Sequence, residues 1–235
     1  MSPLDYGSAG LAEAAAQGET DDMHLTKLEH AAFILRDDSG ARLIVDPGAY
    51  TAPITDAAGI VAVVITHEHP DHWTPEQLER ILAINPGVRI FGPAGVAAAA
   101  EGFDVTVVEA GDEIDADPFA LRFFGGTHAV IHPSIPIVDN LGVLINGSVY
   151  YGGDSFTVPE GVDVDVMAVP AGAPWLKISE VMDFVADVAP KRSFPTHEMV
   201  LSRIGKDMSN QRIAGVVEAA GGEHFPLEPG ESLEI

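Results

Sequence analysis

One stretch of the sequence decides the fold, and it reads Ile60-Val-Ala-Val-Val-Ile-Thr-His67-Glu-His69-Pro-Asp71-His72-Trp73. Its apolar first half is typical of a buried β-strand. Its second half carries three histidines and an aspartate in the spacing H-x-H-x-D-H, and imidazole and carboxylate groups are common ligands of metal ions. A solvated polar loop is the alternative interpretation, but such a loop rarely contains so many nitrogen donors. We therefore predict a strand that ends in a tight loop with four metal-binding side chains.

The rest of the chain predicts an α/β protein. Strand patterns occur over residues 23–28, 32–35, 42–45, 60–65, 88–91, 105–108, 113–114, 120–124, 141–145, 148–151, 164–169, 192–194, 225–227 and 232–235. Helices are expected over residues 75–84, 95–100, 178–188 and 209–220. This order suits two β-sheets packed face to face with helices on their outer sides.

The first 22 residues differ in composition from the rest of the chain. They are small and polar, and glycines at positions 7, 10 and 18 interrupt an alanine-rich stretch. A short helix over residues 11–17 and a flexible segment are both compatible with this pattern. We interpret residues 1–22 as an N-terminal extension, because a core-like pattern starts only at Met23.

The composition is that of a globular protein, with 46% hydrophobic and 20% charged residues. A chain of 235 residues can form one large α/β domain or two small ones. No apolar run reaches the length of a membrane span, and residues 1–17 lack the regions of a signal peptide. The chain has no cysteine, which excludes disulfides and cysteine metal ligands. We expect a cytoplasmic protein whose metal ligands are histidines and carboxylates.

The charge is strongly negative, with 36 acidic residues against 12 basic residues and a net charge of −24. Such a surface repels nucleic-acid backbones and anionic membranes. We therefore expect a small-molecule substrate, with neither nucleic acid nor membrane as a partner, and homo-oligomerisation stays open. Adaptation to high salt and an ordinary acidic surface both explain the charge.

Four more ligand-type side chains lie just past predicted strand ends. His128, Asp154 and His197 each follow a strand, among glycines or other turn-forming residues, and Asp46 ends an earlier strand before Pro-Gly. Strand ends at one edge of a sheet can converge in space. We therefore expect these side chains to join the motif of residues 67–72 in one site.

In this order, the residues resemble the metallo-β-lactamase superfamily. The set comprises Asp46, His67-x-His69-x-Asp71-His72, His128, Asp154 and His197, and the resemblance covers nearly all of the chain from Met23. It implies an αββα sandwich (the metallo-β-lactamase fold), in which two mixed β-sheets carry helices on their outer faces. It also implies that residues 23–235 form a single domain.

A second set of motifs resembles one branch of that superfamily, the ascorbate-6-phosphate-lactonase-like proteins and related metal-dependent hydrolases. The motifs are Gly126-Thr-His-Ala-Val-Ile-His-Pro133, Ile135-Pro136 and Asn140-Leu-Gly142. By this resemblance, His132 and Asn140 support the ligands or contact the substrate. His30 stands where the branch often has a histidine after the first strand, and it is expected to face the site.

The superfamily resemblance implies two metal ions and assigns ligands to them. The first ion would be held by His67, His69 and His128. The second ion would be held by Asp71, His72 and His197, with Asp154 bridging the two. Asp46 would orient a histidine or the loop, and a purely turn-forming role is the alternative. These ligands suit zinc, with manganese or iron as alternatives.

Two residues narrow the reaction class that the resemblance implies. Glu68 lies between the metal histidines and does not replace one, whereas the diiron oxygen-reducing members carry a carboxylate at the position of His69. Asp154 is present, whereas true metallo-β-lactamases lack a bridging aspartate there. We therefore predict a dinuclear hydrolase of a small ester, lactone or phosphoester, in which Asp71 both binds metal and transfers a proton. A catalytically idle metal-binding protein and a nuclease are the alternatives, and the net charge disfavours the nuclease.

Three further side chains could border the substrate. Trp73 follows the metal loop, and Trp175 follows the predicted strand at residues 164–169, where either a pocket wall or the core would suit it. Lys177 could pair with a substrate anion, but a salt bridge at the start of the next helix is the preferred interpretation.

Overall fold

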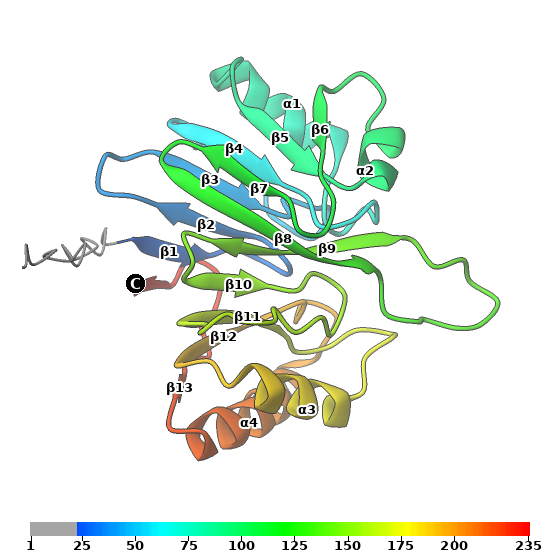
Figure 1. Ribbon diagram of the computed structural model, residues 1–235, viewed down its shortest axis with the longest axis vertical. Helices are drawn as coiled ribbons and strands as arrows, with labels where there is room; N and C mark the ends of the chain where they lie inside the picture. Colours follow the sequence, from blue (N-terminus) through cyan, green and yellow to red (C-terminus); the bar gives the residue numbers. More distant parts are fainter. Residues whose placement is uncertain (1–22) are drawn as a thin grey trace, which may run out of the picture.

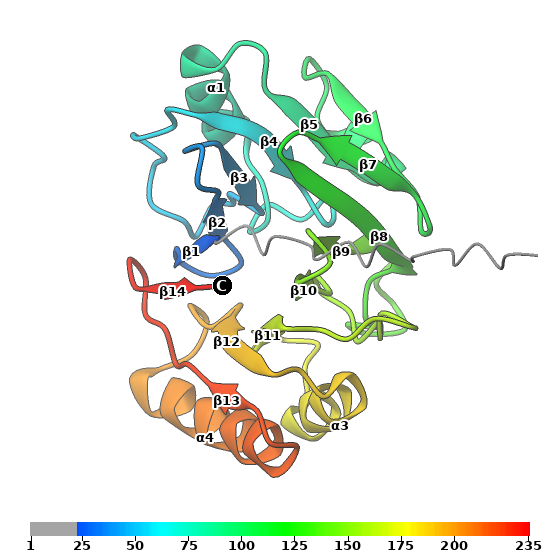
Figure 2. The same cartoon turned by 60° about the vertical axis from the view of Figure 1, so that its left-hand side comes forward.

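The strands form two mixed β-sheets that face each other, with helices on the two outer sides (Figures 1 and 2). A computed structural model describes residues 23–235; the predicted N-terminal extension, residues 1–22, lies outside the described residues. The predicted αββα sandwich, the metallo-β-lactamase fold, is confirmed. Within residues 23–235, no helix is both long and apolar enough to cross a membrane.

The first sheet takes its strands from the N-terminal half and the last strand. Their order across the sheet is β14 (Ser232–Glu234), β1 (His24–Lys27), β2 (Phe33–Arg36), β3 (Arg42–Val45), β4 (Ile60–Val64), β5 (Arg89–Gly92) and β6 (Val105–Val107). The strands from β14 to β3 pair antiparallel, and those from β3 to β6 pair parallel.

The second sheet follows the same plan in the C-terminal half. Its order is β13 (Glu223–His224), β12 (Arg192–Thr196), β11 (Val166–Pro170), β10 (Val149–Tyr151), β9 (Asp139–Ile145), β8 (Phe119–Thr127) and β7 (Glu113–Ala116). Here β10 to β13 pair parallel, and β7 to β10 pair antiparallel.

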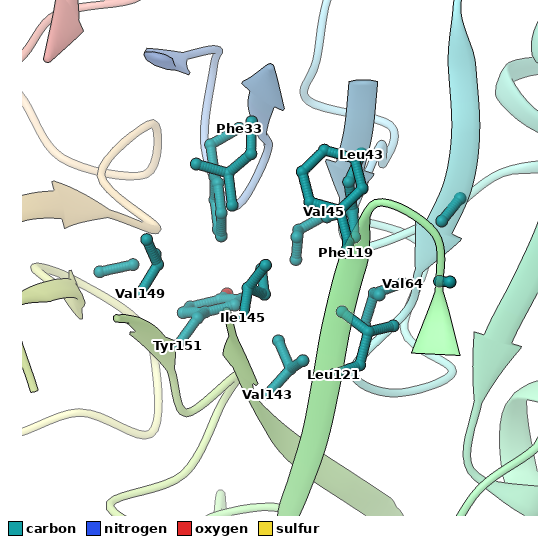
Figure 3. Close-up of a cluster of buried hydrophobic side chains, with 14 of the residues drawn as sticks. Phe33, Leu43, Val45, Val64, Phe119, Leu121, Val143, Ile145, Val149 and Tyr151 are labelled. Atoms are coloured by element: carbon teal, nitrogen blue, oxygen red, sulfur yellow. The ribbon is translucent and has the colours of Figure 1, made fainter. Parts of the chain in front are cut away.

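The main core lies between the two sheets (Figure 3). Phe33 and Val45 from the first sheet point toward Phe119, Val143 and Tyr151 from the second. All five side chains are fully buried, and burying a side chain such as Val or Phe contributes about 1.5–3 kcal/mol. This apolar layer supports the strand ends without using any predicted ligand.

The helices cover the outer faces through two further apolar clusters. Helix α1 (Pro75–Ile84) begins as predicted, because the side chain of Thr74 accepts a hydrogen bond from the backbone N–H of Gln77 and Pro75 occupies the first turn. It packs outside the first sheet, and the short α2 (Ala94–Ala99) follows β5. Helices α3 (Ile178–Val188) and α4 (Arg203–Ala219) cover the second sheet (Figure 2).

Two predicted boundaries are wrong for local reasons. Helix α4 begins six residues before the predicted start at 209, because the Ser202 side chain caps it by accepting from the N–H of Gly205. Strand β8 continues through Gly125 to Thr127, where a loop was predicted. Gly125 has φ 92°, and a Cβ there would lie 2.8 Å from Oγ1 of Thr157. A glycine in a strand therefore marks a close approach here, not a strand end.

The strand after α4 also differs from prediction. A strand was expected at residues 225–227, but β13 comprises only Glu223 and His224. The N–H of Phe225 still donates to the carbonyl of Ser193 at 2.8 Å, so the chain leaves the sheet just after that bond.

Candidate metal centre

The loop after β4 holds the four motif side chains. His67 and His72 are fully buried, whereas His69 and Asp71 are partly exposed. A hydrogen bond of 3.0 Å from the N–H of His72 to the carbonyl of His69 closes the loop. A Cβ at Gly48 would lie 1.8 Å from the carbonyl oxygen of Asp71. The turn after β3 therefore packs directly on the metal loop, which only a glycine allows.

Asp46 lies behind the motif, as expected. Its φ of 46° is unusual for a residue with a side chain. Its Oδ1 accepts from the N–H of Thr66 at 2.8 Å, and its Oδ2 accepts from the Thr66 hydroxyl at 2.7 Å. The same Oδ2 lies 2.7 Å from Nδ1 of His72. Asp46 thus holds both the start of the loop and the orientation of the His72 ring.

The structure brings all seven predicted ligands together in three overlapping groups, each with its ligand atoms within 4.8 Å of one another. One group is His67, His69 and His128. A second is His67, His72 and Asp154. The third is His30, Asp71, His72 and His197. The first group has the three residues predicted for one metal position, the third has those predicted for the other together with His30, and the second contains Asp154 with one histidine from each.

Asp154 occupies the centre of this arrangement and is almost fully buried. Its Oδ2 lies 3.1 Å from Nε2 of His197 and 3.3 Å from Nε2 of His128, and its Oδ1 lies 3.3 Å from Nε2 of His72. The buried Asn140 side chain accepts from the N–H of Asp154 at 2.9 Å. Asn140 therefore shapes the turn that carries Asp154, a contact of the supporting kind, and its role stays a prediction.

The histidine rings are oriented with one nitrogen turned inward. Nδ1 of His72, His128 and His197 each lies against an oxygen to which it can donate. These oxygens belong to the Asp46 side chain and to the main chain of Ala129 and Gly172, at 2.7, 2.5 and 2.7 Å respectively. In all three rings the opposite nitrogen, Nε2, is buried without a hydrogen-bond partner among residues 23–235.

Buried polar atoms without partners cost about 1–3 kcal/mol each. Three inward Nε2 atoms and Oδ1 of Asp154 are in this state, and fixing one ring nitrogen by a hydrogen bond is how proteins orient metal-binding histidines. A set of nitrogen and carboxylate oxygen donors therefore fits divalent transition-metal ions. The residues present match the metal ions that the fold implies.

The charges of the cluster are strongly coupled. Burial would raise the pKa of Asp154, yet the neighbouring His72 and His197 hold that pKa well below its usual range. Burial would lower the pKa of His197, but the charge of Asp154 and the close approach of the Asp154 and Asp71 carboxylates raise it to about 9. The imidazoles and the Asp154 carboxylate thus shift each other's pKa values, and metal binding at these ligands would be coupled to proton release.

The remaining predicted residues divide into those that reach the cluster and those that do not. His30 reaches it: the side chain is fully buried, and its Nε2 lies 3.1 Å from Oδ2 of Asp71. His132 does not: it is exposed, its Nδ1 bonds the Ser134 hydroxyl at 2.7 Å, and none of the ligand groups found in residues 23–235 includes it.

The two tryptophans have different surroundings. Trp73 packs in the outer core against α1, and its indole N–H donates to the carbonyl of Glu68 at 3.0 Å, so a substrate-lining role is wrong for it. The indole N–H of Trp175 donates to Oδ2 of Asp154 at 2.8 Å. Lys177 is exposed and lies 3.8 Å from Glu180, the salt bridge that the sequence favoured.

Sequence reasoning missed three polar residues near the cluster. The hydroxyl of Thr66 lies 3.1 Å from Nδ1 of His67. Lys27 is fully buried and contacts Glu198, which is also buried. A lysine inside an apolar strand and a glutamate directly after a predicted ligand were the available signals.

Replacing Trp175 with Phe should weaken metal binding about 10- to 100-fold, because the buried Asp154 carboxylate loses the donor that orients it. Isothermal titration of metal into the metal-free protein would measure this. The matched control is Tyr150→Phe, which removes a buried donor that binds the carbonyl of Thr157 at 2.5 Å. The control should cost about 1 kcal/mol of stability and leave metal affinity unchanged. Equal affinities in Trp175→Phe and wild type would contradict the orienting role.

Comparison with known proteins identifies the family of this chain. Residues 24–197 match the family described as the β-lactamase superfamily domain. The chain is 37% identical over 185 residues to Protein Rv0786c of Mycobacterium tuberculosis, a match that covers 77% of this chain and 86% of that protein.

Solved structures share the fold at low sequence identity. Igni18, described as a metallo hydrolase from Ignicoccus hospitalis, has a TM-score of 0.69 and 21% identity, covering 91% of this chain and 98% of that one. CmlA, a diiron β-hydroxylase from Streptomyces venezuelae, has a TM-score of 0.67 and 15% identity, covering 92% of this chain and 54% of that one. Both similarities concern the fold.

Proposed function

The chain belongs to the family of the β-lactamase superfamily domain, and from this premise we propose that it is a dinuclear metal-dependent hydrolase of a small ester, lactone or phosphoester. Its metallo-hydrolase fold carries a candidate His/Asp metal site. The lactonase-like motif around His128 supports a lactone as the first substrate to test. A small molecule is the proposed partner, consistent with the net charge of −24.

One observation carries the proposal: two ligand groups lie on either side of a buried carboxylate. His67, His69 and His128 would hold one ion. Asp71, His72 and His197 would hold the other. Asp154 would lie between the ions, because its two oxygens face histidines of both groups.

The residues around the cluster suit hydrolysis. Two bound divalent ions would make water a stronger acid and stabilise negative charge on a reacting carbonyl or phosphoryl oxygen. Asp71 is the most accessible carboxylate of the cluster, with 23% of its side chain exposed, and its Oδ2 can accept and return a proton. Contacts of Oδ2 with His30 at 3.1 Å and His197 at 3.4 Å keep the group in place for that role.

The metal could be zinc, manganese or iron, because imidazole and carboxylate ligands suit all three. CmlA is a diiron hydroxylase with the same fold, so redox chemistry is the competing activity class. A histidine at position 69 favours hydrolysis, on the resemblance described above. Metal analysis and activity assays must therefore be made on the same preparation.

The test is a screen of metal-reconstituted protein against lactones, carboxylic esters and phosphodiesters. We expect about two divalent ions per chain and hydrolysis of one of these classes. Fewer than about one ion per chain, together with no hydrolysis, would support the alternative that the protein is catalytically inactive. Oxygen consumption by protein that contains iron would instead support an oxygenase. Binding to single-stranded RNA that weakens with rising salt concentration would support the nuclease.

A further inference from the structure

A buried ion pair connects the two sheets beside the candidate metal centre. Lys27, the last residue of β1, is fully buried, and Glu198, two residues past the end of β12, is 3% exposed. The Lys27 Nζ lies 3.2 Å from Oε1 of Glu198. Lys27 belongs to the first sheet and Glu198 follows a strand of the second sheet, so the pair connects the two sheets at the edge that carries the candidate ligands.

The Lys27 ammonium has three acceptors, one for each of its protons. Besides Glu198, its Nζ donates to the carbonyls of Leu28 at 2.6 Å and His30 at 3.0 Å. A neutral amine has only two N–H groups, so the charged form is the one that satisfies all three acceptors. Burial opposes that form and lowers the pKa of Lys27, whereas the charge of Glu198 raises it.

The carbonyl of His30 links this pair to the site. It accepts from Lys27 and also from the N–H of His197 at 3.0 Å. His30 and His197 both have φ 59°, a left-handed conformation that residues with side chains rarely adopt. Such conformations cost about 1–3 kcal/mol each and persist only when surrounding contacts enforce them. The two imidazole rings lie 4.0 Å apart, centroid to centroid.

We propose that the Lys27–Glu198 pair is a positioning device that holds His30 and His197 in these conformations and thereby fixes the second metal position. Lys27 holds the His30 carbonyl, and Glu198 holds Lys27 and continues the chain from His197. His197 Nε2 is thus held against Asp71 and Asp154. This inference rests on the proposed two-metal site, and it concerns only one of the two positions.

Buried ion pairs are weak evidence of stabilisation by themselves, so a purely structural role must be separated from positioning. The variants are Lys27→Met, Glu198→Gln, and Lys27→Met combined with Glu198→Met. Lys206→Met is the matched control, because it also removes a lysine beside Glu198. The Lys206 Nζ lies 3.9 Å from the Glu198 carboxylate and 3.3 Å from Glu228.

The first readout needs no metal: amide hydrogen exchange of His197, whose N–H donates to His30, in the metal-free protein. We expect exchange about tenfold faster in Lys27→Met, a smaller increase in Glu198→Gln, and less than about a twofold change in Lys206→Met. Unchanged exchange at His197 in Lys27→Met would overturn the inference.

The second readout is a two-step zinc titration. We expect one of the two affinities to fall about 10- to 100-fold in Lys27→Met, while the other stays at the wild-type value. The double variant leaves no unpaired charge, so it should fold even if Lys27→Met is unstable, yet it should still bind the second ion weakly. Two wild-type affinities in the double variant would overturn the inference. If wild type itself binds fewer than two ions, the two-metal proposal fails, and the hydrogen-exchange result still tests whether Lys27 holds His197.

Discussion

Asp154→Asn should bind at most one metal ion and lose activity about 10³-fold or more, while the protein stays folded. Among residues 23–235, Asp154 is the one carboxylate that contacts histidines of both predicted metal positions, so its negative charge is needed where both ions would lie. The apolar core between the sheets contains none of the ligands. The loss should therefore appear in metal content and turnover and not in the cooperativity of unfolding.

Metal analysis of the purified variant, with turnover on the substrate found by the screen, measures this prediction. Asp187→Asn is the matched control, because it removes an exposed carboxylate on α3. It should keep two ions and wild-type turnover. If Asp154→Asn also kept both ions and full turnover, Asp154 would not be a bridging ligand.

The convergence of the candidate ligands could be predicted from sequence because each of them follows a strand end. His128, Asp154 and His197 are far from the opening motif in sequence, but each lies in a loop just past an apolar strand. The sheets then bring these loops to one edge. The same regularity made α1 and α3 predictable to the residue, since both have clear helical periodicity and end signals.

Other supporting contacts could not be predicted, because they depend on the register between distant strands. Lys27 and Glu198 are separated by 171 residues, and neither residue suggests the other. The family resemblance led us to expect His30 to face the site, but the left-handed backbone that places it there is not visible in the sequence pattern. Trp175 is similar: its distance from Asp154 follows from how the loop after β11 folds back over the cluster.

The contacts around the histidine rings hold the candidate ligands in place before a metal ion binds. Three histidines have one nitrogen fixed by an oxygen acceptor and the other turned inward. The geometry is thus prepared before any ion binds, so little reorganisation is needed on binding. Because these side chains are already in place, the metal-free protein keeps buried polar and charged groups next to one another. The metal-free form is therefore less stable than the metal-bound form.

Removing the metal should accordingly lower the melting temperature by about 10 °C. A ligand present at 1,000 times its dissociation constant stabilises the folded state by about 4 kcal/mol, and each kcal/mol shifts Tm by about 2–4 °C in a domain of this size. Dialysis against a chelator such as dipicolinate, followed by differential scanning calorimetry, would measure the shift. Adding back zinc should restore both Tm and activity.

The Asp154→Asn variant separates a specific effect from a general effect of the chelator. With its metal affinity already reduced, its Tm should fall much less than that of wild type on chelation. Asp187→Asn should behave as wild type does. A chelator-induced shift of the same size in wild type and in Asp154→Asn would place the stabilising metal somewhere other than the cluster around Asp154, and the ligand assignment would then be wrong.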